Sequence, residues 1–231
     1  LTRLQVDFIA NVSHELRTPL TSIRMYVDTL RMNRVTGPEE TAEFLAAIGS
    51  ETERLTSLVE HLLSSKVRED KRRSAATEPL DAADTLRTAL DPLIHGPEAD
   101  RVSVSCPLTT RPRVLADRDA LVEAIRNLVH NALTHGGPGA VEVEMLVCGE
   151  FVRFCVRDHG KGVPIGDQSR IFRRFERGSD STHSRIPGLG LGLAQVKEFA
   201  LQCQGDVSIE CPPEGGSVFT LQLPVWGQTH E

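Results

Sequence analysis

The chain is poor in aromatic residues, in basic charge and in long apolar runs. Aromatic residues make up 4% of the 231 residues, with one Trp and one Tyr, so neither a base-stacking platform nor a carbohydrate cleft is indicated. Lys and Arg number 26 against 32 Asp and Glu, and the net charge of -6 argues against a basic patch for nucleic acid or anionic membranes. No apolar run approaches the roughly 20 residues that span a bilayer. We therefore expect a soluble chain without a nucleic acid partner or membrane contact of its own.

The cysteines give no sign of a metal site or a disulfide framework. Their number is odd, and no two of them have C-x-x-C spacing. Thiols in a reducing cytosol are the simpler interpretation. The five residues are Cys106, Cys148, Cys155, Cys203 and Cys211.

What the chain does contain is enough apolar sequence for one large domain or two ordinary ones. Hydrophobic residues make up 39% and charged residues 25%, which is near the globular average. The chain begins at Leu1 rather than Met and enters helical periodicity at once, which predicts a fragment of a longer protein.

Residues 1–67 show helical periodicity in two arms. Apolar residues recur at spacings of three and four from Val6 to Leu30, and again from Leu45 to Leu62, with Thr36-Gly37-Pro38 between the arms. Two helices cannot enclose a core, whereas two copies of the hairpin can do so as a four-helix bundle. The pattern therefore predicts a homodimer. Its seam would contain Ile23, Val27, Leu30, Leu55, Val59 and Leu62.

The remainder is predicted to be a charged linker at 68–77 followed by a mixed α/β domain at 78–231. Helices are expected over 82–93, 118–134, 168–175 and 189–201. Short strands are expected over 78–80, 101–105 and 113–116, and β-hairpins at 140–147 with 151–156 and at 206–211 with 217–223.

A histidine on the first helix is predicted to face water beside a carboxylate. His14 lies two residues from both Val12 and Leu16, which places it roughly opposite the apolar stripe. Thr18 lies four residues further along the same face, and Glu15 stands beside them. A neighbouring carboxylate can hold the imidazole in one tautomer and accept its proton, which makes the ring a nucleophile near neutral pH.

This segment alone leaves a plainer interpretation open. Pro19 has no N–H to donate to the carbonyl of Glu15, so the helix is expected to kink or loosen beside His14. A lone histidine in such a helix is more often a solvated surface residue. The choice depends on the rest of the chain.

Two further segments have the chemistry of a nucleotide site. Asn127 and Asn131 lie four apart on one face of a predicted helix, and their amide oxygens could hold Mg²⁺, directly or through water, beside phosphates. Asp158 follows a predicted strand, where its carboxylate could accept a hydrogen bond from the exocyclic amine of a base. Gly160 and Gly162 would let the backbone approach that base.

A third segment completes this set. Gly188, Gly190 and Gly192 open a predicted helix, whose N–H groups and dipole suit a polyphosphate. Each segment alone also fits a surface Asn pair, a turn or a glycine-rich helix start. The three together, in this order, supply metal, base and phosphate contacts, which favours nucleotide binding.

These motifs together resemble those of the bacterial sensor histidine kinases of two-component systems, over nearly the whole chain. His14 to Leu20 resembles the family's H box, Asn127 to Asn131 its N box, Asp158 to Gly162 its G1 box, Ile171 to Arg177 its F box, and Gly188 to Gly192 its G2 box. The resemblance implies an α + α/β fold. A helical hairpin forming a dimeric four-helix bundle would precede a two-layer sandwich of the histidine kinase, heat-shock-90 and gyrase ATPase type.

The resemblance also implies a role for each matching residue. His14 would be the phosphoacceptor, Glu15 its general base, and Thr18 the residue that orients water for dephosphorylation of a partner. Arg177 would contact the γ-phosphate of ATP, next to a lid at 178–187. The implied ATP and Mg²⁺ residues are Asn127, Asn131 (the Mg²⁺ ligand), His135, Asp158 (the adenine anchor), Gly160, Gly162, Gly188, Gly190 and Gly192.

The match departs from the commonest pattern after the N box. Thr134 and His135 stand where many members have Lys and then Tyr. Loss of the Lys removes one positive charge from the phosphate site, whereas His135 can still stack on adenine. A glycine-rich segment, Gly136 to Gly139, follows and gives no further help to ATP binding.

The implied function is autophosphorylation of His14 with ATP, followed by transfer to an aspartate of a response regulator receiver domain. The family also implies a cytoplasmic location in a sensor anchored upstream in the inner membrane. Two alternatives stay open: a kinase biased toward phosphatase activity, and a non-catalytic dimeric scaffold that binds nucleotide.

Overall fold

The structure is a computed structural model that describes residues 3–32, 35, 37–52, 55–56, 77–96, 98–106, 111–174, 176 and 190–227, without the side chains of 3–12, 14 and 15. The chain divides into two compact units. The first contains Leu1–Ser74 and the second contains Ala75–Ile186 and Gly190–Glu231.

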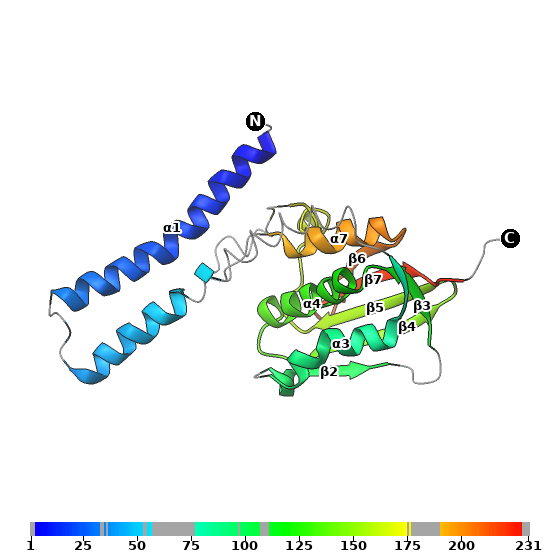
Figure 1. Cartoon of the computed structure of the whole chain (residues 1–231), viewed down its shortest axis with the longest axis horizontal. Coiled ribbons are helices and arrows are strands. Elements are labelled where there is room, and N and C mark those ends of the chain that lie inside the picture. The colour runs from blue at the N-terminus through cyan, green and yellow to red at the C-terminus, as the bar shows by residue number, and fades with distance from the viewer. Residues whose placement is uncertain are drawn as a thin grey trace. The chain divides into compact units, whose positions relative to one another are not determined.

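The first unit is built on two helical arms. The first arm is α1 (Arg3–Arg31), and residues 38–52 form a second helical stretch. The two arms meet at Tyr26 and Phe44, whose rings pack edge to face with centroids 5.3 Å apart. The predicted helical hairpin is thus present in the structure (Figure 1). Pro19 is buried within α1, and the helix continues through it.

The second unit is built on a five-stranded mixed sheet with the strand order β2-β4-β5-β7-β6. Strands β2 and β4 pair in parallel, and the other neighbours are antiparallel. The bounds are β2 (Val102–Ser105), β4 (Val141–Cys148), β5 (Phe151–Asp158), β6 (Asp206–Glu210) and β7 (Ser217–Pro224). A second sheet pairs β1 (Glu78–Asp81) with β3 (Arg113–Ala116), and a bridge between Val114 and Val225 joins it to the chain after β7.

One face of the five-stranded sheet carries the core. Burial alternates strictly along β5, so that Val152, Phe154 and Val156 are buried and their neighbours in sequence point the other way. The buried face is covered by α3 (Ala82–Ile94), α4 (Arg118–His135) and α7 (Gly192–Gln202), which Figure 1 shows lying over the sheet. The unit is therefore a two-layer α/β sandwich.

Two aspartates start the helices that carry much of this core. The side chain of Asp81 accepts hydrogen bonds from the backbone N–H groups of Ala83 and Asp84 at the start of α3. Asp117 accepts one from Ala120 at the start of α4. Each side chain satisfies N–H groups that have no partner within the helix.

Most of the predicted elements are present, but one helix was placed wrongly. The helix expected over 168–175 is instead α5 (Ile165–Gln168), and the residues from 169 to 174 form turns. Helix α7 also begins later than residue 189. Gly190 has a φ of +63°, which is left-handed and incompatible with a helix start there.

The fold class is confirmed in both units: a helical hairpin and an α/β sandwich. The predicted linker at 68–77 lies outside the described residues except for Thr77, so the predicted domain boundaries stay predictions. All five cysteines lie in the described part of the chain and carry thiols. Burial raises the pKa of Cys203 to about 11, with a smaller contribution from Asp117, so this thiol is protonated near neutral pH.

Candidate nucleotide and phosphoacceptor sites

Helix α4 carries both candidate asparagines. Asn127 and Asn131 lie four residues apart on this helix, and both are half-buried. Asn127 donates a hydrogen bond from Nδ2 to Oε1 of Gln195 on α7, at 3.4 Å. The first residue of α7, Gly192, lies beside it, since a Cβ there would be 3.7 Å from the amide group of Asn127. The structure thus places the Asn segment next to the start of α7.

Asp158 lies at the end of β5 in an almost closed environment. It is 4% exposed, and its Oδ1 accepts a hydrogen bond of 2.9 Å from the backbone N–H of Gly160. Its second oxygen, Oδ2, makes no hydrogen bond within the described part of the chain. A carboxylate oxygen in this state is an acceptor available to a donor such as an exocyclic amine.

Glycines surround Asp158 so closely that side chains would not fit. A Cβ on Gly136 would lie 2.5 Å from the Cβ of Asp158, and a Cβ on Gly160 would lie 2.9 Å from the Cα of Gly136. On another side, Gly216 donates its N–H to the carbonyl of Gly160 at 2.8 Å, and a Cβ on Gly216 would lie 2.1 Å from the carbonyl oxygen of Asp158. These glycines form a cradle around the carboxylate.

The two groups of residues lie along one helix. Asn127 is next to Gly192, and nine residues later Gly136, the C-cap of α4, closes on Asp158. Nine residues of α-helix rise about 13.5 Å, a distance comparable to the length of an extended nucleoside triphosphate. The arrangement fits adenine at Asp158 and phosphates toward Asn131 and the start of α7.

The residues present also fit a Mg²⁺ ion that is held mainly by its substrate. The described residues contain no group of three or more His, Cys, Asp or Glu that could hold a metal. Mg²⁺ commonly keeps several waters and binds through one or two protein oxygens together with phosphates. Asn131 on α4 can supply one such oxygen.

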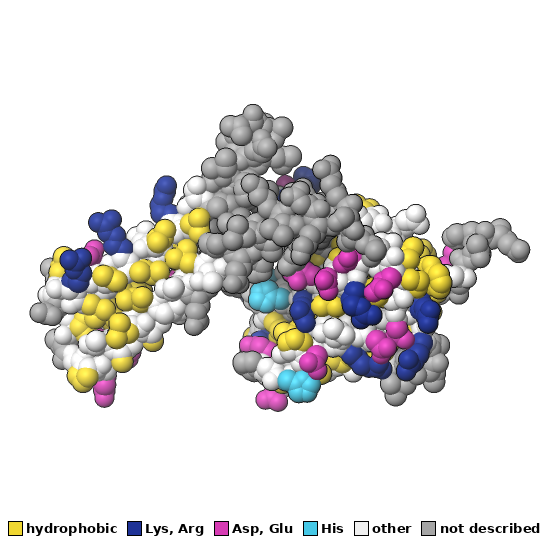
Figure 2. All heavy atoms as spheres, viewed as in Figure 1, with side chains coloured by type: hydrophobic (Ala, Val, Ile, Leu, Met, Phe, Trp, Pro, Cys, Tyr) yellow, Lys and Arg dark blue, Asp and Glu magenta, His cyan; other side chains and the backbone are white. Residues whose placement is uncertain are grey.

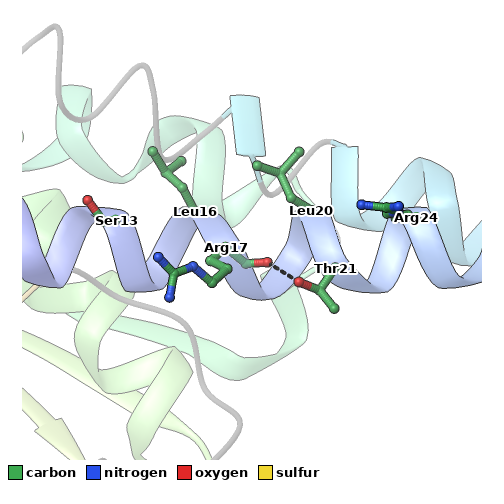
Figure 3. Close-up of a pocket in the computed structure, with 6 residues that line it drawn as sticks. All are labelled: Ser13, Leu16, Arg17, Leu20, Thr21 and Arg24. Carbon is green, nitrogen blue, oxygen red and sulfur yellow. Dashed lines mark hydrogen bonds between the residues drawn. The ribbon is translucent and has the colours of Figure 1, made fainter.

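The phosphoacceptor candidates lie on α1. The backbone of His14 and Glu15 is helical, while their side chains lie outside the described residues. An open depression of about 660 Å³ lies along one face of α1, and Figure 3 shows its lining residues Ser13, Leu16, Arg17, Leu20, Thr21 and Arg24. A second groove of about 320 Å³ includes Thr18, which is exposed.

Of the other predicted site residues, some lie within the described part of the chain and some lie outside it. His135 is exposed in the last turn of α4, and Gly162 has a φ of +75° beside Gly216. Arg177, Gly188 and the lid at 178–187 lie outside the described residues.

The sequence did not reveal three residues at this site that lie outside the predicted motifs. Gly216 lies between β6 and β7, where the hairpin pattern gives no sign of a contact with Asp158. Gln195 and Gly136 were given no role. The nearest signal was the glycine-rich segment after α4, but its contact with Asp158 depends on packing between α4 and β5 that no local pattern reveals.

Two family models match this chain. The model described as "Histidine kinase-, DNA gyrase B-, and HSP90-like ATPase" matches residues 116–227, and that described as "His Kinase A (phospho-acceptor) domain" matches residues 4–69. The chain belongs to the sensor histidine kinase family of two-component systems.

Named relatives are similar over almost the whole chain. The probable sensor histidine kinase TcrY of Mycobacterium tuberculosis is 35% identical over 227 residues, which is 96% of this chain and 46% of the relative. The sensor-like histidine kinase SenX3 of Mycolicibacterium smegmatis is 31% identical over 219 residues, 94% of this chain and 57% of the relative. The chain thus spans about half the length of these curated relatives.

Solved structures show the same fold. The Acinetobacter baumannii histidine kinase AdeS superposes with a TM-score of 0.67 at 21% identity, over 93% of this chain and 98% of that one. The mycobacterial sensor histidine kinase MprB matches with a TM-score of 0.54 at 26% identity, over 65% of this chain and 98% of that one. None of the helices described here is both long and apolar enough to cross a membrane.

Proposed function

We propose that this chain phosphorylates His14 with ATP and passes the phosphoryl group to an aspartate of a response regulator. The observation that carries the proposal is the buried carboxylate of Asp158, whose Oδ2 is available inside a glycine cradle. We infer the reaction from the family, because the chain matches both a phosphoacceptor domain and an ATPase domain. We keep the expected cytoplasmic location within a longer sensor as part of the same proposal.

In the proposed reaction, a nitrogen of the His14 ring attacks the γ-phosphorus of ATP. The bond from this phosphorus to the β–γ bridging oxygen breaks, ADP leaves, and Glu15 accepts the proton of the ring. Arg177 neutralises charge on the transferred group. Positioning and charge neutralisation supply most of the catalysis, because phosphoryl transfer asks little covalent chemistry of a protein beyond its nucleophile.

Each proposed nucleotide contact has its own task. Asp158 selects adenine through its exocyclic amine, His135 stacks on the base, and Asn127 orients the start of α7. Glycines at 160, 162, 188, 190 and 192 give the backbone close access to base and phosphates. Mg²⁺, when bound at Asn131, would neutralise the phosphate charge.

The experiment that tests this function is incubation of the chain with γ-labelled ATP and a panel of receiver domains. We expect acid-labile label on His14 that moves to one receiver. A non-catalytic scaffold would bind ATP without labelling, and a phosphatase-biased protein would remove label from a phosphorylated receiver faster than it labels His14.

The homodimer is proposed from the apolar surface of the hairpin. Leu20, Met25, Met32 and Leu45 are each more than half exposed, and Figure 2 shows apolar side chains gathered on the visible face of the hairpin. Apolar patches of this kind mark contact surfaces. Two hairpins would bury them together with the predicted seam in a four-helix bundle. Of that seam, Ile23, Val27, Leu30 and Leu55 are half-buried in the hairpin, and Val59 and Leu62 lie outside the described residues.

We predict that a fragment of residues 1–70 sediments as a dimer at micromolar concentration. Leu20→Glu should shift the fragment toward monomer, because the bundle would have to bury a charge. Glu43→Gln, at an exposed polar position on the second arm, serves as the control and should remain dimeric. A folded wild-type monomer at that concentration would contradict the proposed dimer.

Thr18 offers a way to separate two activities on one helix turn. It is exposed in a groove shared with Arg17 and Thr21, where its hydroxyl could orient a water toward a phosphorylated receiver. We predict that Thr18→Ala leaves autophosphorylation within a few-fold, about 1 kcal/mol of barrier or less, and slows receiver dephosphorylation much more.

Thr21→Ala is the matched control for this variant. Thr21 is also exposed, and its hydroxyl donates to the carbonyl of Arg17 at 2.8 Å. It therefore reports what loss of a threonine hydroxyl does to the helix alone. Time courses of both reactions with a matched receiver would decide: equal losses in the two activities of Thr18→Ala would assign its hydroxyl to helix geometry.

A further inference from the structure

The segment after α4 has almost no side chains with which to hold its shape. It consists of Gly136, Gly137, Pro138 and Gly139, and Gly137 has a φ of +72°. Its first residue touches Asp158. A loop of this composition has high conformational freedom, so its position against the carboxylate must be fixed by hydrogen bonds to its backbone.

Arg101 supplies such hydrogen bonds from a distant part of the sequence. It ends the 3-10 helix η1 (Ala99–Arg101) before β2. Its Nη2 donates to the carbonyl oxygens of Gly137 at 2.5 Å and Leu133 at 3.4 Å, and its Nε donates to that of Gly139 at 3.3 Å. One guanidinium thus joins the last turn of α4 to two residues of the turn that follows, Gly137 and Gly139.

The remaining interactions hold Arg101 in place. Its Nη1 donates to the carboxylate of Glu98 at 2.7 Å, and its side chain is 27% exposed. Positive charge at the C-terminal end of α4 is also favourable for the helix dipole. A lysine cannot reproduce the arrangement, because it carries one nitrogen where arginine has a planar fork with five donors.

The contacts continue from this loop to the carboxylate. Gly136 lies between the carbonyl of Ala132 and the side chain of Asp158, and a Cβ on Gly139 would be 3.4 Å from the Cβ of His159. Movement of the loop would therefore change the walls around Asp158.

We infer that Arg101 is a positioning residue for adenine binding: its guanidinium fixes the Gly136–Gly139 turn and thereby holds the cradle around Asp158 in the shape that accepts the base. This inference rests on the proposed adenine site at Asp158. Without the arginine, the loop would sample several positions. The apparent dissociation constant would rise in inverse proportion to the fraction of molecules that keep the cradle.

The test is calorimetric titration of the 231-residue chain with ADP and GDP, which avoids turnover. We expect Arg101→Gln to weaken ADP binding about tenfold. A loss of this size corresponds to a variant in which roughly a tenth of the molecules have the loop in the conformation that binds the base. GDP binding should change less, so that the preference for ADP over GDP narrows. Arg101→Lys should show a smaller loss, about threefold, because lysine keeps the positive charge and a long side chain, which glutamine lacks.

A kinetic measurement on the same variants separates positioning from catalysis. With ATP as the varied substrate, Arg101→Gln should raise the KM for autophosphorylation and leave the rate at saturating ATP within twofold of the wild type. Uniform loss of binding has this effect.

Arg126→Gln is the matched structural control. Arg126 also bonds to two backbone carbonyls, those of Ala89 at 3.1 Å and Thr88 at 3.3 Å on α3. The control loses a comparable set of cross-links without touching the loop, so ADP affinity should stay within twofold. If Arg101→Gln and Arg126→Gln weaken ADP binding equally, the loss is a general effect of reduced stability, and the inference is overturned.

A third variant distinguishes this inference from the function on which it rests. If Asp158→Asn loses ADP binding while Arg101→Gln keeps it, the positioning role is wrong and the adenine site stands. If Asp158→Asn retains ADP binding, the adenine site is misplaced and the inference falls with it.

Discussion

Asp158→Asn should abolish ATP binding at concentrations that saturate the wild-type chain, while the α/β unit stays folded. Asn can keep the internal hydrogen bond, because its amide oxygen can accept from Gly160 N–H as Oδ1 of Asp158 does at 2.9 Å. The NH₂ group then takes the place of Oδ2. The adenine amine would meet a donor instead of an acceptor.

The expected loss follows from the burial of the group. A hydrogen bond to a charged partner contributes about 1.5–3 kcal/mol, and a donor left facing a donor adds a desolvation cost. A change of about 2.7 kcal/mol corresponds to roughly a 100-fold weaker dissociation constant. Titration calorimetry measures this directly, and near-UV circular dichroism checks the fold.

Asp81→Asn is the control for the same chemical change. The carboxylate of Asp81 also accepts hydrogen bonds from backbone N–H groups, those of Ala83 and Asp84 at 3.0 and 3.1 Å, and Asn serves that role about as well. ATP affinity should be unchanged in this variant. Retained affinity in folded Asp158→Asn would show that adenine binds elsewhere.

The sequence predicted the elements whose patterns are local. Alternation of apolar and polar residues located β4 and β5 within two residues, because each strand packs only one face on the core. Helix α4 was located because its apolar residues repeat with helical spacing. The error at 168–175 arose where the chain forms turns after a single helical turn at Ile165–Gln168, which is too short to leave a periodic pattern.

The site was predictable only as a set of separate motifs. Asp158, Asn127 and Gly192 were identified as candidates, but their arrangement depends on how α4 packs against β5 and α7. The role of Gly216 and the bonds of Arg101 across 32 to 38 residues of sequence follow from tertiary contacts, which have no local signal. The resemblance to histidine kinases provided the order of the motifs and not these contacts.

His14→Gln should eliminate acid-labile phosphorylation and leave ATP binding intact. Gln has no ring nitrogen that can attack phosphorus, whereas the proposed nucleotide residues Asn131 on α4 and Asp158 on β5 belong to the other unit. The rate should fall about 1,000-fold or more, which corresponds to about 4 kcal/mol in the activation barrier. Label retention after alkali and its loss after acid would be followed with γ-labelled ATP.

His95→Gln is the matched control, since His95 is exposed at the end of α3 and has no proposed role in nucleotide binding or transfer. Its labelling should equal that of the wild-type chain. Label that persists in His14→Gln would place the phosphoacceptor at another residue.

A mixture of the two inactive variants tests whether the phosphoryl group is transferred within one chain or between the two subunits of the proposed dimer. His14→Gln would keep a nucleotide site but no acceptor, and Asp158→Asn would keep the acceptor without ATP. Mixed dimers should recover label on the Asp158→Asn chain if the phosphoryl group passes between subunits. If mixed dimers form and stay unlabelled, transfer is confined to one chain, and each ATPase unit must reach the His14 of its own hairpin.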